Sequence, residues 1–165
     1  MSGNTDDHYN LYRFVEAQNP VYDQVCSELR EGFKMTHWMW FIFPQLTDLG
    51  RSSKAQYFGI QNLEQARRYL LDPLLGDRLM ECVRIMLSHE HKSAHEILGS
   101  PDDYKFRSCI TLFREVVEES QETTLFTCAL DKFYEGKADL GTMKLLDNLE
   151  GGESSFPMVE KVTSD

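Results

Sequence analysis

Two short segments of the chain concentrate the residue types that could bind a ligand or catalyse a reaction. In the first segment, residues 34–53, an aromatic run follows His37 and is itself followed by polar side chains. Its candidate ligand-binding residues are Trp38, Trp40, Gln45, Arg51 and Ser52. An aromatic wall beside a few polar groups is the usual composition of a small-molecule pocket. His37 is the candidate general acid or base, because the pKa of an imidazole lies near neutrality.

The second segment, residues 102–111, places polar side chains at helical spacing. Lys105, Ser108 and Thr111 follow one another at intervals of three residues, so on a helix they share one face. We expect this stripe to line a phosphate-sized pocket, with Lys105 and Ser108 as ligand-binding residues. Asp103 is a candidate catalytic carboxylate, although an acidic residue in the first turn of a helix can also act simply as a cap.

Together the segments favour a phosphate-bearing, nucleotide-like ligand of the ADP-ribose type, which the chain would bind or hydrolyse at an N-glycosidic bond. An indole ring would stack on the base, and the cations and hydroxyl groups would hold phosphate or ribose. Glu64 or Asp103 would supply the acid–base group, because a carboxylate stabilises an oxocarbenium-like transition state. Two alternatives remain open: a protein-interaction domain without catalysis, and motif residues that serve only a stable core.

Metal and cofactor motifs are weak or missing in the sequence. His89, His91 and His95 have spacings that metal ligands tolerate, but they fall in a polar connection and form no HExxH motif. The four cysteines, Cys26, Cys82, Cys109 and Cys128, form no CxxC pair and lie within apolar patterns, as buried free thiols do. The chain has no GxGxxG or P-loop motif. We therefore expect neither a metal nor a cofactor.

Composition limits the function classes further. The chain has 165 residues, with 17 Lys and Arg against 27 Asp and Glu, and a net charge of −10. This charge disfavours binding to duplex nucleic acid, and the near-neutral middle of the chain is where a small anionic ligand would bind. No apolar run is long enough to span a membrane, and the polar N-terminus is unlike a secretory signal, so a cytoplasmic location is expected.

Hydrophobic periodicity predicts the elements that must position these residues. Helical patterns begin at residue 11 and recur over 20–31, 63–71, 72–87, 93–98, 100–117, 123–134 and 143–146. The run 37–43 is apolar on every side, so helix and strand both remain open. The pattern predicts an all-α, single compact domain of about seven or eight helices around one core. It divides the chain into a polar N-terminal extension (1–10), the helical domain (11–148) and an acidic, flexible C-terminal tail (149–165).

One run of the sequence also carries a family resemblance. The ten residues from His37 to Leu46, HWMWFIFPQL, resemble the DUF1810 (Rv1873-like) family, as do the later stretches 49–52, 72–76 and 102–113. The resemblance covers roughly residues 11–146 and implies a compact, mostly α-helical domain without an assigned activity. A more limited likeness to the NADAR (YbiA-like) family rests on Glu64, Ala66 and Tyr69, and it implies chemistry at N-glycosidic bonds.

Overall fold

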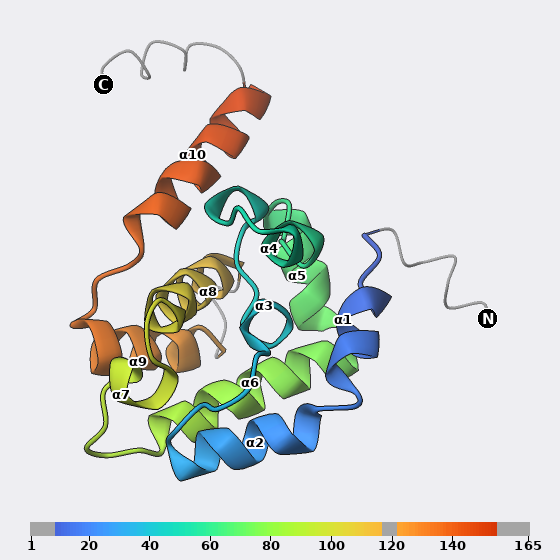
Figure 1. Ribbon diagram of the computed structural model, residues 1–165. Coiled ribbons are helices and arrows are strands. Elements are labelled where there is room, and N and C mark those ends of the chain that lie inside the picture. The colour runs from blue at the N-terminus through green and yellow to red at the C-terminus, as the bar shows by residue number, and fades with distance from the viewer. Residues whose placement is uncertain (1–8, 117–121, 155–165) are drawn as a thin grey trace.

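The computed structural model describes residues 9–116 and 122–154, and this part of the chain is all-α (Figure 1). It contains α1 (Tyr12–Gln18), α2 (Tyr22–Glu31), α3 (Met39–Ile42), the 3-10 turn η2 (Thr47–Leu49), α4 (Ser53–Tyr57), α5 (Leu63–Leu71), α6 (Pro73–Leu87), α7 (Ala94–Leu98), α8 (Asp102–Val116), α9 (Glu122–Tyr134) and α10 (Leu140–Ser154). The all-α prediction is confirmed. The ten α-helices of the described residues exceed the expected number because α3 and α4 are too short to leave a periodic pattern.

Local side chains start and stop the helices where the sequence indicates. The Asn62 carboxamide oxygen accepts the Gln65 backbone N–H at 2.8 Å and caps α5. The Asp72 carboxylate accepts two N–H groups of the first turn of α6, each at 3.0 Å. Gly32 ends α2 with a left-handed φ of 78°, which glycine adopts without steric cost. These boundaries need only short-range signals, and for that reason the sequence predicts them well.

One aromatic core holds the helices together. Helix α6 packs against α2, α5 and α9, and α8 packs against α5, α7 and α9. The largest fully buried side chains include Trp38, Tyr69, Phe14, Phe43, Phe106 and Phe113. The Phe43 and Phe106 rings meet edge to face with centroids 4.7 Å apart. Such a pair adds about 0.5–1.5 kcal/mol to the burial of its surface, so this contact ties the aromatic run to α8.

The segment between α2 and α5 crosses the middle of the molecule as short pieces (Figure 1). A parallel β-bridge joins Leu46 to Ile60, with the Ile60 N–H donating to the Gln45 carbonyl at 2.9 Å. For residues 37–43 the sequence left both helix and strand open. The structure contains a single helical turn there, α3, over Met39–Ile42. The two indoles at this turn have different surroundings. Trp38 lies in the core, whereas Trp40 is half-buried.

The C-terminal helix is longer than expected. The pattern predicts a helix over 143–146 only, whereas α10 runs from Leu140 to Ser154 and contacts α8 and η2. The Asp139 carboxylate starts it by accepting the N–H and hydroxyl of Thr142 at 2.9 and 2.7 Å. Residues 149–154 of the expected tail therefore belong to α10, and 155–165 lie outside the described residues, as does 1–8 of the expected N-terminal extension. No helix of the described part combines the length and apolar character needed to cross a membrane.

At Gly76, α5 and α6 approach each other so closely that there is no room for a side chain. A Cβ at this position would lie 2.1 Å from the carbonyl oxygen of Leu70, a backbone atom that cannot move aside. We expect Gly76→Ala to lower the free energy of unfolding by about 2 kcal/mol or more, measured by urea denaturation. Asp77→Ala, at the exposed neighbouring position, is the control and should change it by less than about 0.5 kcal/mol. Equal midpoints for the two variants would contradict this account of the contact.

Candidate functional site

A cleft of about 430 Å³ lies where the loop around η2 meets α8 and the start of α10. The polar side chains that line it are Gln45, Arg51, Ser52, Lys105, Ser108 and Asp139. All of these except Asp139 belong to the set predicted from the sequence. We call this site the Arg51 cleft. The fold thus brings together the two candidate segments, which 48 residues separate in the chain.

The two cations of the Arg51 cleft differ in their surroundings. Arg51 is exposed, and no carboxylate of the described residues forms an ion pair with it. Lys105 belongs to α8, with Ser108 one turn further along the same face. The Ser52 hydroxyl caps α4 by accepting the Ala55 N–H at 3.1 Å. Its proton, and the guanidinium of Arg51, are therefore available to a ligand.

Tyr104 is a residue of this cleft that the sequence analysis missed. Its ring is 63% exposed, and it lines the cleft beside the apolar side chains of Leu49 and Pro101. The Ser108 hydroxyl donates to the Tyr104 carbonyl at 3.2 Å, as expected for residues four apart on a helix. That spacing is the signal that could have found Tyr104, because it places the ring on the face that carries Ser108.

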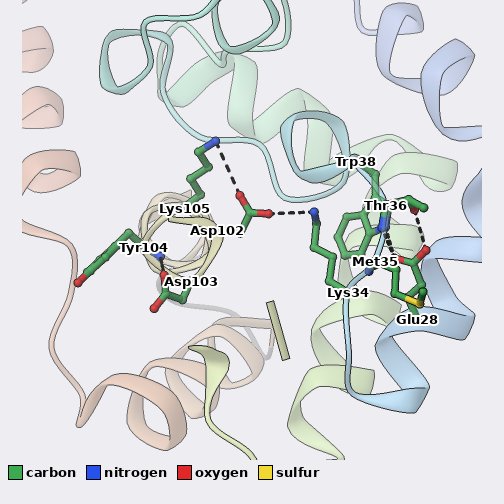
Figure 2. A network of polar contacts seen from close by, with 9 residues as sticks. All are labelled: Glu28, Lys34, Met35, Thr36, Trp38, Asp102, Asp103, Tyr104 and Lys105. Atoms are coloured by element: carbon green, nitrogen blue, oxygen red, sulfur yellow. Dashed lines mark hydrogen bonds and ion pairs between the residues drawn. The ribbon is translucent and has the colours of Figure 1, made fainter. Parts of the chain in front are cut away.

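A chain of polar contacts links Lys105 to the core, as Figure 2 shows. One oxygen of Asp102 lies 2.9 Å from the Lys34 ammonium, and the other lies 3.8 Å from the Lys105 ammonium. Lys34 is only 8% exposed and lies 4.9 Å from the centre of the Trp38 ring. Because Asp102 binds Lys34 closely and Lys105 only loosely, Lys105 keeps donors for a ligand in the Arg51 cleft.

The network ends at Glu28, a buried carboxylate that the sequence analysis did not select. It accepts the backbone N–H of Met35 at 2.9 Å, the N–H and hydroxyl of Thr36 at 3.1 and 2.6 Å, and the indole N–H of Trp38 at 2.9 Å (Figure 2). Gln24 donates a further hydrogen bond at 2.9 Å. Burial alone would raise the pKa of Glu28, but these hydrogen bonds outweigh it and lower the pKa to about 2. The charged carboxylate thus fixes the loop that precedes α3.

The two indoles predicted to stack on a ligand do not face the Arg51 cleft. Trp38 is 1% exposed and its N–H is bound to Glu28, so it is a core residue in this conformation. Trp40 is half-buried, and the ammonium groups of Lys54 and Lys105 lie 4.9 and 5.8 Å from its ring centre. The hollow beside Trp40 measures about 10 Å³, which is too small for a base. Tyr104 is the exposed ring of the cleft instead.

None of the three predicted catalytic residues lines the Arg51 cleft. His37 is exposed, outside the cleft. Glu64 pairs with Arg67 and Arg68 on the surface of α5, and the hydrogen bonds from Arg68 and Arg67 lower its pKa. Asp103 lies 3.4 Å from His95 and accepts the Tyr104 N–H at 3.0 Å. The carboxylate that the fold places in the cleft is Asp139, which the sequence analysis missed.

A second cleft, of about 460 Å³, contains none of the predicted site residues. Its cation, Arg13, is almost buried and donates to the carbonyls of Tyr57 and Gly59 at 2.7 and 3.0 Å, and to those of Tyr9 and Asn10 at 2.8 and 2.6 Å. Through these hydrogen bonds, the guanidinium joins α1 to the chain around α4. Arg13 therefore has a structural role in joining these segments.

Each of the three histidines considered as metal ligands contacts a different residue. The His89 ring lies 2.6 Å from the Leu29 carbonyl, His91 lies beside Glu90, and His95 lies beside Asp103. Within residues 9–116 and 122–154, no three His, Cys, Asp or Glu side chains are grouped as metal ligands would be.

Comparison with known proteins places this geometry in a family. The sequence pattern of the family described as "Protein of unknown function (DUF1810)" matches residues 8–146. The crystal structure of the conserved hypothetical protein Rv1873 from Mycobacterium tuberculosis is similar, with 46% identity and a TM-score of 0.80. The match covers 83% of this chain and 96% of that one. A comparison with curated proteins finds none that matches this chain.

The buried carboxylate of Glu28 gives a pH-dependent prediction. Because folding lowers its pKa from the ordinary value of 4.5 to about 2, its contribution to stability is complete above about pH 5 and is lost as the pH falls towards 2. We expect Glu28→Gln to lower the free energy of unfolding by about 3 kcal/mol at pH 7. Urea denaturation at several pH values should show this gap closing below pH 4.

The matched control for this experiment is Glu31→Gln, an exposed position on the same helix. It removes the same charge without removing a buried hydrogen-bond acceptor, so its stability should follow that of the original chain at every pH. A Glu28→Gln gap that stays constant down to pH 2 would show that the ionised carboxylate is not what stabilises the loop.

Proposed function

The chain belongs to the DUF1810 family of proteins of unknown function, and from its own cleft we propose that it binds a phosphate-bearing, nucleotide-like small molecule. One observation carries the proposal: the fold gathers Arg51 and Lys105 with the hydroxyls of Ser52 and Ser108 around a single cleft. The chain as a whole has a net charge of −10, so a cleft that two cations line differs from the average surface and favours an anionic ligand.

Electrostatics makes this cleft suitable for an anion. A guanidinium presents a planar fork of donors that matches two phosphate oxygens, and an ammonium adds a mobile point charge. Arg51 has no ion-pair partner among the described residues, so a ligand need not compete with a carboxylate for it. Among the described residues, the Lys105 ammonium contacts Asp102 at 3.8 Å and lies 5.8 Å from the centre of the Trp40 ring, and both contacts are loose. Walls of low dielectric concentrate the field of both charges in the cleft.

The size and the aromatic wall of the cleft support a nucleotide-like ligand over a bare phosphate ion. A volume of about 430 Å³ falls within the range of small-molecule sites, roughly 300–1,000 Å³. The exposed Tyr104 ring lies next to Lys105 in the chain and can stack on a base while the cations hold the phosphate. Stacking of a base on an aromatic ring contributes about 1–3 kcal/mol.

The arrangement supports binding better than hydrolysis. Cleavage of a glycosidic bond uses two carboxylates placed about 5–10 Å apart on either side of the bond. Among the described residues that line the Arg51 cleft, Asp139 is the one carboxylate, and one of its oxygens is held by Thr142. We therefore propose ligand binding as the function of this cleft, with N-glycosidic cleavage to be assayed on whichever ligand binds.

Thermal unfolding against a panel of ADP-ribose, NAD, nucleotides and sugar phosphates tests the proposal. A ligand at a hundred times its Kd adds about 2.7 kcal/mol to stability, which raises Tm by several degrees in a domain of this size. We expect compounds with both a phosphate and a base to raise Tm, and chromatography of the same samples reports any cleavage. Absence of a shift with every compound at millimolar concentration would refute ligand binding at this site.

Two substitutions locate the site. We expect Arg51→Ala and Lys105→Ala each to weaken binding at least tenfold, about 1.4 kcal/mol, because each removes a cation from the phosphate. Arg51→Ala should leave the Tm of the free protein unchanged, since Arg51 has no ion-pair partner to lose among the described residues. Lys132→Ala, an exposed cation on α9, is the control and should bind normally. A ligand shift that survives both cleft substitutions would place the ligand elsewhere.

A further inference from the structure

A pair of buried thiols lies outside the Arg51 cleft, between α2 and α6. These helices pack side by side along one edge of the molecule (Figure 1). Cys26 of α2 is 4% exposed and Cys82 of α6 is completely buried. The Cys82 thiol donates to the Tyr22 hydroxyl at 3.8 Å, and Tyr22 lies one turn before Cys26 on α2, so Cys82 faces the side of α2 that carries Cys26. The proposed function gives this group no role.

Helix geometry allows these two sulfurs to be joined. Axes of packed helices lie about 8–10 Å apart and each Cα lies about 2.3 Å from its axis, so facing Cα atoms approach to about 3.4–5.4 Å, a range that overlaps the span of a disulfide. Disulfides span Cα separations of about 4.4–6.8 Å. Of the other two cysteines, Cys109 is buried without a thiol partner among the described residues, and Cys128 is exposed.

The environments of the two thiols give them different reactivity. The hydrogen bond from Cys82 lowers the pKa of Cys26 to about 7 against the effect of burial, and the charge of Arg30 acts in the same direction. The same hydrogen bond, together with burial, raises the pKa of Cys82 well above its ordinary value. Of the two thiols, Cys26 is therefore the one that more readily forms the nucleophilic thiolate, and Cys82 holds its proton more tightly.

We propose that Cys26 and Cys82 are a peroxide-sensitive pair that is oxidised to an intramolecular disulfide joining α2 to α6. The Cys26 thiolate attacks one oxygen of hydrogen peroxide, the O–O bond breaks, and a sulfenic acid and hydroxide form. The Cys82 sulfur then attacks the Cys26 sulfur, and the sulfenic oxygen leaves as water with the Cys82 proton. The two sulfurs lose two electrons and the peroxide gains them. Hydrogen peroxide is small enough to reach a thiol that is almost covered.

Alkylation and peptide mapping of the full chain test the proposal. The protein is treated with millimolar hydrogen peroxide, quenched with catalase, unfolded and alkylated with N-ethylmaleimide, and its mass is measured. We expect two fewer maleimide adducts per chain, a proteolytic fragment that links Cys26 to Cys82, and full reversal by dithiothreitol. The oxidised protein should also have a higher Tm, because the disulfide closes a long loop of the unfolded chain.

Matched variants separate this pair from the other thiols. Cys128→Ser, at the exposed cysteine, should still form the disulfide. Cys82→Ser should instead leave a sulfenic acid on Cys26 that dimedone captures, and Cys26→Ser should abolish both products. If either core variant does not fold, the presence or absence of the Cys26–Cys82 fragment in the peptide map of the original chain still tests the proposal. Retention of maleimide at both Cys26 and Cys82 after peroxide, or linkage only between chains through Cys128, would overturn the proposal.

Discussion

The burial of one carboxylate organises the centre of this molecule. A buried charge destabilises a protein by several kcal/mol unless hydrogen bonds replace its water, and Glu28 receives such bonds from both the backbone and the side chains of the loop that follows α2. The same bonds satisfy loop N–H groups that no helix would satisfy. Because Trp38 is one of the donors, Glu28 also holds the residue that immediately precedes α3 in the core. The Phe43–Phe106 contact then attaches this segment to α8.

The helices could be predicted from the sequence where their ends are encoded nearby. Asn62, Asp72 and Gly32 each act within four residues, so their roles are visible without the fold. Glu28 was not predictable in this way, because an acidic residue in an amphipathic helix normally faces solvent and its donors come from a loop up to ten residues later. The acidic composition from residue 149 onward indicated a flexible tail, yet α10 continues to Ser154.

In the candidate site, too, the residues that local spacing relates could be predicted from the sequence, and those that only the fold brings together could not. Lys105 and Ser108 share a cleft because helical spacing alone puts them on one face, and Tyr104 follows from that geometry. That Arg51 faces them depends on the path of the chain through η2, which no local pattern encodes. The choice of carboxylate could not be read from residue types, because surface pairing occupies Glu64 and Asp103, while the turn before α10 brings Asp139 into the cleft.

Asp102 has two cationic neighbours, and only one of them lines the Arg51 cleft. An anion bound as proposed would attract Lys105 and leave Lys34 as the counterion of Asp102 among the described residues, so that Asp102 would act only between α8 and the loop that Glu28 holds. The same free energy acts in reverse, because thermodynamic coupling between two sites is reciprocal. If the cleft binds an anion as proposed, its occupancy and the order of the loop after α2 are linked equilibria, joined through a single carboxylate.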